Sequence, residues 1–403
     1  MRMKFNKLSQ LVLAAAFSLT AAGLLTACST LTADFVYVTS ALATGSNQYG
    51  QVDVFEVNQD SGRMRKIPAS PFPSGGRNPV ADAPAPDNAS LYVVNEDDNS
   101  IVQFIIGNDG KLYPNYTTNT PGVFPFAIAP VKGYLYVLDT YQPLPTCNSA
   151  SPCSGSVGVF PINKDDSLGA AISNTSNGTS YWPLTLPASP NDVIVPTGIA
   201  TGASGAYVYV TAYDSSVSPT VGYVFGFSVN SDGSLAPVNG GTPFAAGTHP
   251  SAVAGNPAAN DLYVTDMGPG NILGFQINAG MLTPLSGSPY PSGNQPVAIV
   301  VDGKGRFAYA ANSLDANVTA YTINAGNLTR VGAYTTGAQP VALGIDPYLN
   351  QYLYTANFLG NTVSGFQINS TDGTLLIAQF SPFKSNTNPT AVAAIPHPVP
   401  IPK

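Results

Sequence analysis

The sequence predicts an all-β protein folded as a seven-bladed β-propeller with four-stranded blades. The main observation is a motif, Tyr-Val-x-Asn/Asp or a close relative, which returns seven times. Its usual spacing of roughly 45–55 residues is the mark of a radial or solenoidal array. The chain also holds 39 glycines and 36 prolines and shows no sustained helical periodicity, as expected of an all-β chain with many turns. The copies of the motif begin at Tyr37, Tyr92, Tyr136, Tyr209, Tyr263, Tyr309 and Tyr354.

A proline-led segment of small apolar residues precedes each motif, and we expect it to be the innermost strand of a blade. Proline is tolerated at the first residue of a strand, and small side chains suit the crowded centre of a radial array. These segments begin at Pro79, Pro125, Pro196, Pro250, Pro296, Pro340 and Pro389.

Two further strands complete each unit. A Phe-rich segment follows the motif and roughly alternates apolar with small or polar residues, like a strand with one face in a core. A turn such as Asp109-Gly110 or Ala279-Gly280 comes next, and its glycine supplies the positive φ of a tight hairpin. A weaker strand then follows, which gives four strands per blade.

The ends of the repeat region predict how the ring closes. The first complete strand, near Phe35, is the second strand of a blade, and the last segment, 389–395, is a lone first strand. The C-terminal strand should therefore complete blade one and leave no open edge. We assign the propeller to residues 35–396, a Pro-rich tail to 397–403, and insertions in blade three to 140–156 and 163–195.

The N-terminal residues are predicted to be a targeting segment. Arg2, Lys4 and Lys7 precede an apolar run, and Leu25-Thr26-Ala27-Cys28 then follows. This resembles the lipobox of bacterial lipoproteins, so residues 1–27 would be a signal peptide, Cys28 would carry lipid, and 28–34 would be a tether. In a Gram-negative host, a serine after the cysteine favours the outer membrane. The alternative is an ordinary secretory signal with an incidental cysteine.

Export would change the charge balance of the chain. The signal holds three of the 15 Lys and Arg residues and no acidic one, so its removal leaves 12 basic against 22 acidic residues, a net charge of −10. Such an acidic protein is not expected to bind nucleic acid, or anionic phosphorylated ligands without a local basic pocket.

Two cysteines remain once Cys28 is lipidated. Cys147 and Cys153 are separated by five residues, and an exported protein meets an oxidising compartment. We expect a disulfide that pins a loop of blade three. A metal site built on these two thiols is the alternative, although no further cysteine or nearby histidine supports it.

A candidate site follows from the strand order, because loops after the Tyr-rich strand and loops before the Pro-led strand share one face. The polar residues expected at this rim are Asn95, Asp97, Asp139, Asp266, Asn312 and Asn357. A strand-ending Asn or Asp often bonds its own turn. The functional alternative is a polar rim that binds a sugar, a lactone or a divalent cation, although no contiguous calcium-binding loop is present.

Two further rim residues are candidates for catalysis. His249 directly precedes a Pro-led strand and is the plausible imidazole base, unless it only bonds its loop. His397, in the tail, is expected to be exposed and inert. Arg77 lies at a comparable rim position in another blade.

The repeated unit resembles the lactonase-type seven-bladed propeller family, which overlaps the Tyr-Val-Thr-Asn repeat proteins. A second recurring element, Ser/Thr-Pro-aromatic followed by three residues that end in Gly or Asn, supports this resemblance, which covers about 35–396. The element occurs at 70–75, 242–247, 288–293 and 381–386. The resemblance implies hydrolysis of 6-phosphogluconolactone, using basic and histidine residues at the channel mouth. Here only Arg77 and His249 occupy comparable places.

Two functions are therefore expected to compete. The first is a lipid-anchored, monomeric, extracytoplasmic propeller that binds a ligand or a partner protein through its loop-rich face. The second is a lactone hydrolase that uses His249 or a cation held by carboxylates, because ester hydrolysis needs a base or metal-activated water and an oxyanion partner.

Overall fold

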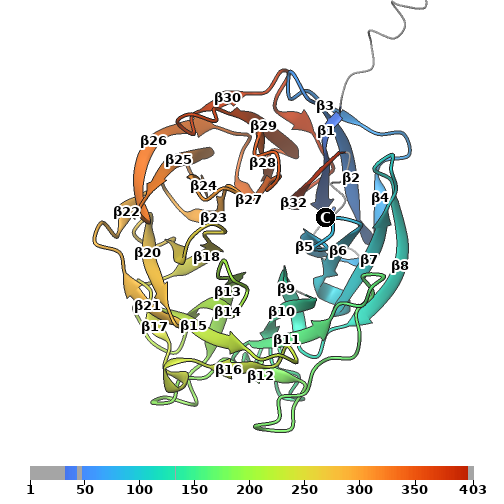
Figure 1. Cartoon of the computed structure of the whole chain (residues 1–403). Coiled ribbons are helices and arrows are strands. Elements are labelled where there is room, and N and C mark those ends of the chain that lie inside the picture. The colour runs from blue at the N-terminus through green and yellow to red at the C-terminus, as the bar shows by residue number, and fades with distance from the viewer. Residues whose placement is uncertain (1–31, 43–47, 132, 398–403) are drawn as a thin grey trace, which may run out of the picture.

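The computed structural model describes residues 32–42, 48–131 and 133–397 and shows seven antiparallel sheets arranged in a ring (Figure 1). The predicted fold class is confirmed, including closure of the first blade by the C-terminal strand β32. The predicted signal peptide, Cys28 and most of the tail lie outside the described residues. Among the described residues, no helix is long and apolar enough to span a bilayer.

The first four blades have the predicted strand order, from the channel outward. Blade one consists of β32 (Pro389–Pro396), β1 (Thr32–Ser40), β2 (Tyr49–Asn58) and β3 (Met64–Lys66), with β4 (Phe72–Arg77) beside β2. Blade two consists of β5 (Pro79–Pro84), β6 (Ser90–Asn95), β7 (Ser100–Ile106) and β8 (Leu112–Asn119), with the short 3-10 helix η2 (Glu96–Asp98) between β6 and β7. Blade three consists of β9 (Val123–Val131), β10 (Tyr134–Tyr141), β11 (Ser156–Pro161) and β12 (Tyr181–Pro183). Blade four consists of β13 (Ile194–Thr201), β14 (Tyr207–Asp214), β15 (Val221–Val229) and β16 (Leu235–Pro237), with η3 (Asn239–Gly241) and β17 (Phe244–Ala245) after them.

The last three blades repeat the same order. Blade five consists of β18 (Pro250–Gly255), β19 (Asp261–Asp266), β20 (Asn271–Asn278) and β21 (Met281–Pro284), with β22 (Tyr290–Pro291) beside β20. Blade six consists of β23 (Pro296–Val301), β24 (Phe307–Asn312), β25 (Asn317–Asn324) and β26 (Asn327–Thr335). Blade seven consists of β27 (Pro340–Ile345), β28 (Tyr352–Asn357), β29 (Thr362–Ile368) and β30 (Leu375–Ile377), with β31 (Phe383–Lys384) beside β29.

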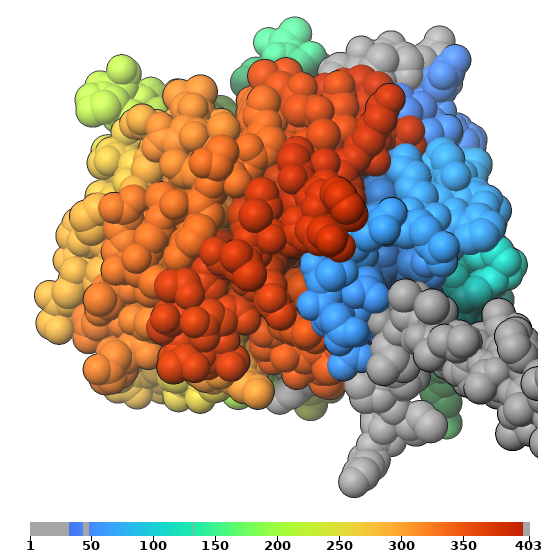
Figure 2. Space-filling view, turned by 90° about the horizontal axis from the view of Figure 1, so that it is seen from above, coloured from blue at the N-terminus to red at the C-terminus, as the bar shows by residue number. Residues whose placement is uncertain are grey.

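The innermost strands form an unbroken ring around the centre. Each one contacts the innermost strand of the next blade, and β32 contacts both β27 and β5, as their places in Figure 1 indicate. Seen from the side, the red C-terminal blade lies directly against the blue N-terminal blades (Figure 2). Because β32 pairs with β1 along its whole length, the two ends of the described chain hold the ring shut.

The strand register defines a channel-mouth face. In every blade the leading proline lies opposite the last residue of the Tyr motif, as in Pro250 opposite Asp266 and Pro340 opposite Asn357. The loops that enter the first strand and those that leave the second strand therefore meet at one end of the barrel, as expected. The chain reaches Thr32 at the opposite end.

The motif tyrosines also connect neighbouring blades. Each ring is fully buried, and in most blades its hydroxyl donates to a carbonyl in the β-turn of the next blade. One example is the bond from Tyr309 to Gly373, at 3.1 Å. The other hydrogen bonds of this kind join Tyr37 to Gly110, Tyr92 to Asp166, Tyr209 to Gly280 and Tyr263 to Gly326. The motif thus builds the ring as well as the blade cores.

Blade three departs from the expected layout in one respect. Its fourth strand, β12, lies inside the stretch 163–195 that the sequence suggested was an insertion. Trp182, in this strand, is 4% exposed and its indole N–H donates to the Leu235 carbonyl at 2.7 Å. Trp182 therefore belongs to the core between blades three and four and is not available to a ligand.

Candidate functional site

The predicted binding rim is mostly inside the protein. Of its six residues, Asn95, Asp139, Asp266, Asn312 and Asn357 are at most 2% exposed, and only Asp97 is partly exposed. The structure therefore corrects the expected position of these side chains. They lie where the second strand ends, but strands one and three cover them on either side.

Hydrogen bonds within the blade explain most of these positions. The Asn312 amide donates to Asn317 Oδ1 at 2.7 Å and to Thr319 Oγ1 at 2.8 Å, while its oxygen accepts from Ser292. Asn357 is held in the same way by Thr355, Thr362 and Ser364. Buried amides with satisfied donors and acceptors are structural, so the turn-bonding interpretation is favoured for these two.

Asp266 holds the loop that carries the candidate histidine. Its carboxylate accepts from the backbone amide of Thr248 at 3.0 Å and from that of His249 at 2.9 Å. The His249 carbonyl in turn accepts from the Met267 amide at 2.9 Å. Asp266 therefore positions His249 through the backbone, and its oxygens are not free to bind a cation.

Asp139 is the least satisfied member of the predicted rim. It is fully buried, and neither carboxylate oxygen has a hydrogen-bond partner of normal geometry. Burial raises its pKa from 3.8 to about 8, and the nearby Thr120 hydroxyl and Gly122 amide oppose this shift. A neutral carboxylic acid packed against Gly122 is a structural group and cannot serve as an anionic ligand at pH 7.

Arg77 is separated from His249. Its guanidinium donates to Asp98 Oδ1 at 2.7 Å and to the Asp97 carbonyl at 3.1 Å, which links the end of β4 to η2. It lines its own hollow of about 510 Å³, together with residues of blades one and two. The structure therefore does not bring the two predicted catalytic residues together, because Arg77 ends β4 of blade one and His249 precedes the first strand of blade five.

His249 lines a larger hollow on the channel-mouth face. This hollow has a volume of about 740 Å³, and loops of blades four, five and six form its walls. Besides His249, its polar lining residues are Thr220, Thr248, Asn294 and Gln295, and none of its lining residues is Lys, Arg, Asp or Glu. It is therefore a neutral, hydrogen-bonding site with one titratable side chain.

The imidazole of His249 is held in place and kept neutral. Its ring stacks on Tyr213, with 4.1 Å between centroids and 28° between planes. Burial lowers the pKa of His249 below 6.5, against the opposing effect of Asp266. No side chain or backbone group of the described residues bonds either ring nitrogen, so a neutral base faces the hollow.

The carboxylates do not converge on a cation. Over residues 32–42, 48–131 and 133–397, no three His, Cys, Asp or Glu side chains come together as metal ligands would.

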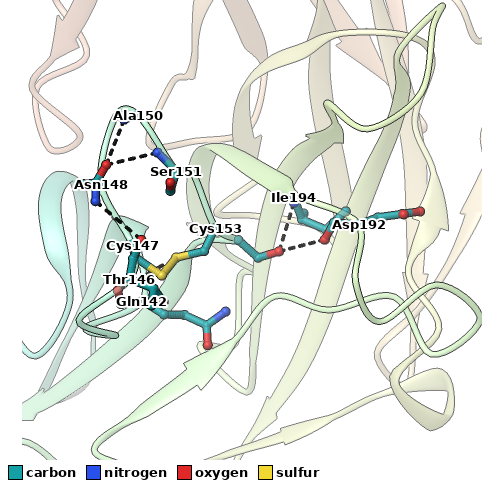
Figure 3. Close-up of a disulfide and its surroundings, with 10 residues drawn as sticks. Gln142, Thr146, Cys147, Asn148, Ala150, Ser151, Cys153, Asp192 and Ile194 are labelled. Carbon is teal, nitrogen blue, oxygen red and sulfur yellow. Dashed lines mark hydrogen bonds between the residues drawn. A yellow bond between two sulfur atoms is a disulfide. The ribbon is translucent and has the colours of Figure 1, made fainter.

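Cys147 and Cys153 are joined by a disulfide, with their Cα atoms 5.5 Å apart, in the loop 142–155 between β10 and β11 (Figure 3). Next to it, the Ser154 hydroxyl donates to the Asp192 carbonyl at 3.0 Å and accepts from the Ile194 amide at 3.0 Å. The loop of blade three is thereby fastened to the entry of blade four.

Asp82 is an unusual residue that the sequence analysis missed. It lies three residues after the leading proline of β5, and it is the one ionisable side chain on the seven innermost strands. The equivalent residues of the other blades are aliphatic: Ile128, Ile199, Val253, Ile299, Leu343 and Val392. Thr39 donates to Asp82 Oδ2 at 2.6 Å, and burial raises the Asp82 pKa to about 7. Alignment of the seven Pro-led segments could have revealed it.

His397 also differs from expectation. It is half-buried, its amide donates to the Ala33 carbonyl at 2.8 Å, and its ring packs edge-on against Phe35 at 5.0 Å. It supports the closure of blade one at the end of the barrel away from His249.

Comparison with known proteins places this geometry in context. Residues 184–390, just over half of the chain, match the family model described as lactonase, 7-bladed beta-propeller. No curated protein matches the sequence.

Several solved structures share the fold. A candidate 6-phosphogluconolactonase from Bacteroides uniformis is 18% identical, with a TM-score of 0.69 over 91% of this chain and 100% of that one. A periplasmic gluconolactonase from Pseudomonas aeruginosa is 19% identical, with a TM-score of 0.64 over 91% of this chain and 100% of that one. At these identities the likeness establishes the architecture, and the chemistry must be argued from the site.

Proposed function

Because the chain belongs to the seven-bladed β-propeller lactonase family, we propose that it hydrolyses an unphosphorylated sugar lactone in the hollow beside His249, outside the cytoplasm. The observation that carries this proposal is the neutral imidazole of His249, stacked on Tyr213 and facing a neutral hollow of about 740 Å³. A base that is unprotonated at pH 7 can activate water without a metal ion.

Lactone hydrolysis needs a base that activates water, a proton donor to the leaving oxygen and a hydrogen-bond donor to the oxyanion. The His249 imidazole accepts a proton from water while the water oxygen attacks the lactone carbonyl carbon. The ring C–O bond then breaks, and the proton passes to the departing alkoxide oxygen, which leaves a hydroxy acid. The Gln295 amide is the candidate donor to the oxyanion, because its NH₂ group makes no hydrogen bond with the described residues while its oxygen accepts from Ser313 at 3.4 Å.

The charge of the hollow argues for a substrate without phosphate. None of its lining residues is Lys or Arg, and burial keeps His249 neutral. A phosphate group would enter the hollow without a cation to pair with, which is unfavourable in a partly desolvated site. The Arg77 guanidinium cannot help, because Asp98 already neutralises it in a separate hollow.

The test compares glucono-1,5-lactone with its 6-phosphate, with and without a chelator, after subtracting spontaneous hydrolysis. We expect turnover of the unphosphorylated lactone that the chelator does not change. His249→Gln should lower kcat/KM by roughly 10²–10⁴-fold, while His397→Gln, the matched control at the other end of the barrel, should not. Wild-type turnover no faster than background, or full activity of His249→Gln, would refute the proposal.

A second candidate function is ligand binding without hydrolysis. It is favoured by the absence of a second titratable side chain among the hollow's lining residues, because a lone base supplies only part of a catalytic set. Calorimetry with gluconate and with glucono-1,5-lactone separates the two functions. Binding that depends on His249 without any turnover would support this candidate.

The proposed location is the cell envelope, with lipid on Cys28 and outer-membrane attachment in a Gram-negative host. The support is the lipobox-like sequence before Cys28 together with an oxidised cysteine pair, which fits an exported protein. Mass spectrometry of the mature N-terminus and detergent partitioning of wild type and Cys28→Ser test it. An unmodified N-terminus at residue 1 would overturn it.

A further inference from the structure

The repeat is broken by aromatic side chains at the mouth of blades three, four and five. The residue before the leading proline is polar in four blades, where it is Asn78, Gln295, Gln339 and Asn388. In blade three the same position is Phe124, and in blade five it is His249. Tyr141 is the last residue of the second strand of blade three, and Tyr213 is the last but one of the second strand of blade four, so four rings gather on one arc of the rim.

The four rings form two packed pairs on adjacent blades. Phe124 packs edge-on against Tyr141 with 6.0 Å between centroids, and Tyr213 stacks on His249 at 4.1 Å. The two pairs lie on adjacent blades that are bonded to each other at this end. Ser154 bonds both Gln142, which follows Tyr141, and Ile194, and the next residue, Val195, pairs with Tyr213. We call Phe124, Tyr141, Tyr213 and His249 the aromatic arc.

The arc is open to a ligand. All four side chains are half-buried, so part of each ring remains accessible. Within the described part of the chain, the hydroxyls of Tyr141 and Tyr213 bond no protein group. The arc therefore presents apolar ring surface together with two free phenol groups.

The arc is built at a conformational cost. Phe124 adopts φ 57°, a left-handed conformation that is unusual and strained for a bulky residue. It is held there by the Asn99 side chain, which accepts from the Phe124 amide at 2.7 Å. Four other blades place Asn or Gln at this position with a similar φ, so an aromatic ring here is not required by the backbone.

The disulfide loop supports the same arc. Gln142, which directly follows Tyr141, donates its amide to the Ser154 carbonyl at 3.2 Å, and Cys153 lies beside the Gln142 carbonyl. Ser154 is bonded in turn to the entry of blade four, as Figure 3 shows for the disulfide loop and Asp192. The covalent link therefore restrains the strand end from which Tyr141 projects.

We infer that the aromatic arc is a subsite for a second sugar ring, so that the substrate is a lactone carrying a glycosidic extension. The C–H face of a pyranose packs on aromatic rings, and its hydroxyls can bond the free phenols of Tyr141 and Tyr213. His249 belongs to both the arc and the hollow, so a lactone ring in the hollow would place its glycosidic partner over blade four. That the substrate is a lactone rests on the proposed function, whereas the binding of a sugar ring to the aromatic arc does not.

The test uses variants that change the arc without touching the base. Phe124→Asn installs the residue that blades two and one carry at this position, and Tyr141→Ser removes a ring from the end of β10. Tyr116→Ser, which removes an exposed tyrosine from the outer strand β8, is the matched control. Circular dichroism and thermal melts establish that each variant is folded.

Cellobionolactone and maltobionolactone are compared with glucono-1,5-lactone as substrates. We expect Phe124→Asn and Tyr141→Ser each to lower kcat/KM for at least one disaccharide lactone by roughly tenfold, and to leave the monosaccharide lactone within about twofold. Tyr116→Ser should change neither. Equal effects on all lactones, or none on the disaccharides, would overturn the subsite.

A binding measurement separates this inference from the proposed hydrolysis. Calorimetry with cellobiose and maltose should detect binding that weakens about tenfold in Tyr141→Ser. If no lactone is hydrolysed but this arc-dependent binding is found, the hydrolase proposal fails and the sugar subsite stands. If the monosaccharide lactone is hydrolysed and neither disaccharide binds, the subsite fails alone.

Discussion

The buried carboxyl of Asp139 should make the protein less stable as the pH rises. Its pKa is raised by burial from 3.8 to about 8, so the folded protein keeps a proton that the unfolded chain loses. For a raised carboxyl pKa, stability is unaffected below pH 3.8, falls progressively as the pH rises to about 8, and then stays low. Replacing the carboxyl by a neutral amide should remove this loss.

The size of the effect follows from the pKa difference. Between pH 3.8 and the folded pKa, each pH unit lowers the free energy of unfolding by about 1.4 kcal/mol. Because pH 7 lies about three units above 3.8, the loss of stability at pH 7 is about 4 kcal/mol as an upper value. Asp139→Asn should therefore unfold at higher urea and temperature than wild type at pH 7–8. The difference between the two proteins should be smallest near pH 4.

The amide can be accommodated at this position. The equivalent residues of blades six and seven, Asn312 and Asn357, are fully buried asparagines, and the Ser156 hydroxyl opposite Asp139 has no partner in the described residues. An asparagine amide can donate to it. The introduced group is therefore expected to gain a bond as well as to lose the charge.

The assay is urea unfolding of wild type and Asp139→Asn at pH 4.5, 6, 7 and 8, followed by fluorescence of Trp182. Asp266→Asn is the control, because its carboxylate accepts from two backbone amides and its loss should destabilise the protein. A difference between Asp139→Asn and wild type that does not grow with pH would refute the reasoning.

Three further predictions concern stability. Asp82→Val, which restores the aliphatic residue of the other innermost strands, should raise the melting temperature at pH 8 more than at pH 5, because burial lifts the Asp82 pKa to about 7; a uniform change would contradict this. Tyr309→Phe should cost about 1 kcal/mol in urea unfolding, since it deletes a bond to the next blade. Tyr136→Phe should cost close to nothing, because that hydroxyl has no partner in the described chain. Equal losses of stability in the two variants would disprove a stabilising bond from Tyr309 to the next blade. Replacing Cys147 and Cys153 by serine should lower stability by no more than about 2 kcal/mol and should speed proteolysis of the loop; unchanged proteolysis would count against its bracing role.

The fold was predictable because each blade is made by local interactions that repeat. Leading prolines, turn glycines and the period-2 pattern act over a few residues, and seven copies of one pattern leave few alternative architectures. The closure by β32 followed from the phase of the repeat at the two chain ends. Blade three was predicted less well, because β12 begins at Tyr181, far along the chain from the end of β11 at Pro161, whereas a short turn joins the third and fourth strands of every other blade.

The candidate site could be predicted only in part. The sequence placed His249 at the channel mouth, where the structure finds it. For the rim asparagines it allowed both a structural and a ligand-binding role. It could not show that neighbouring strands bury Asn312 and Asn357. The separation of Arg77 from His249 was also beyond the sequence, since each loop adopts its place independently.

The sequence by itself therefore determined the architecture, the face on which a site can lie and the single histidine at that face. The tertiary structure decided which groups meet. Tyr213 reaches His249 from another blade, Phe124 packs against Tyr141 at the neighbouring blade, and Thr39 donates to Asp82 from an adjacent blade. The physical reason is that a periodic pattern encodes contacts between neighbours in the chain, whereas burial, pKa and ring stacking depend on residues that only the closed ring brings together.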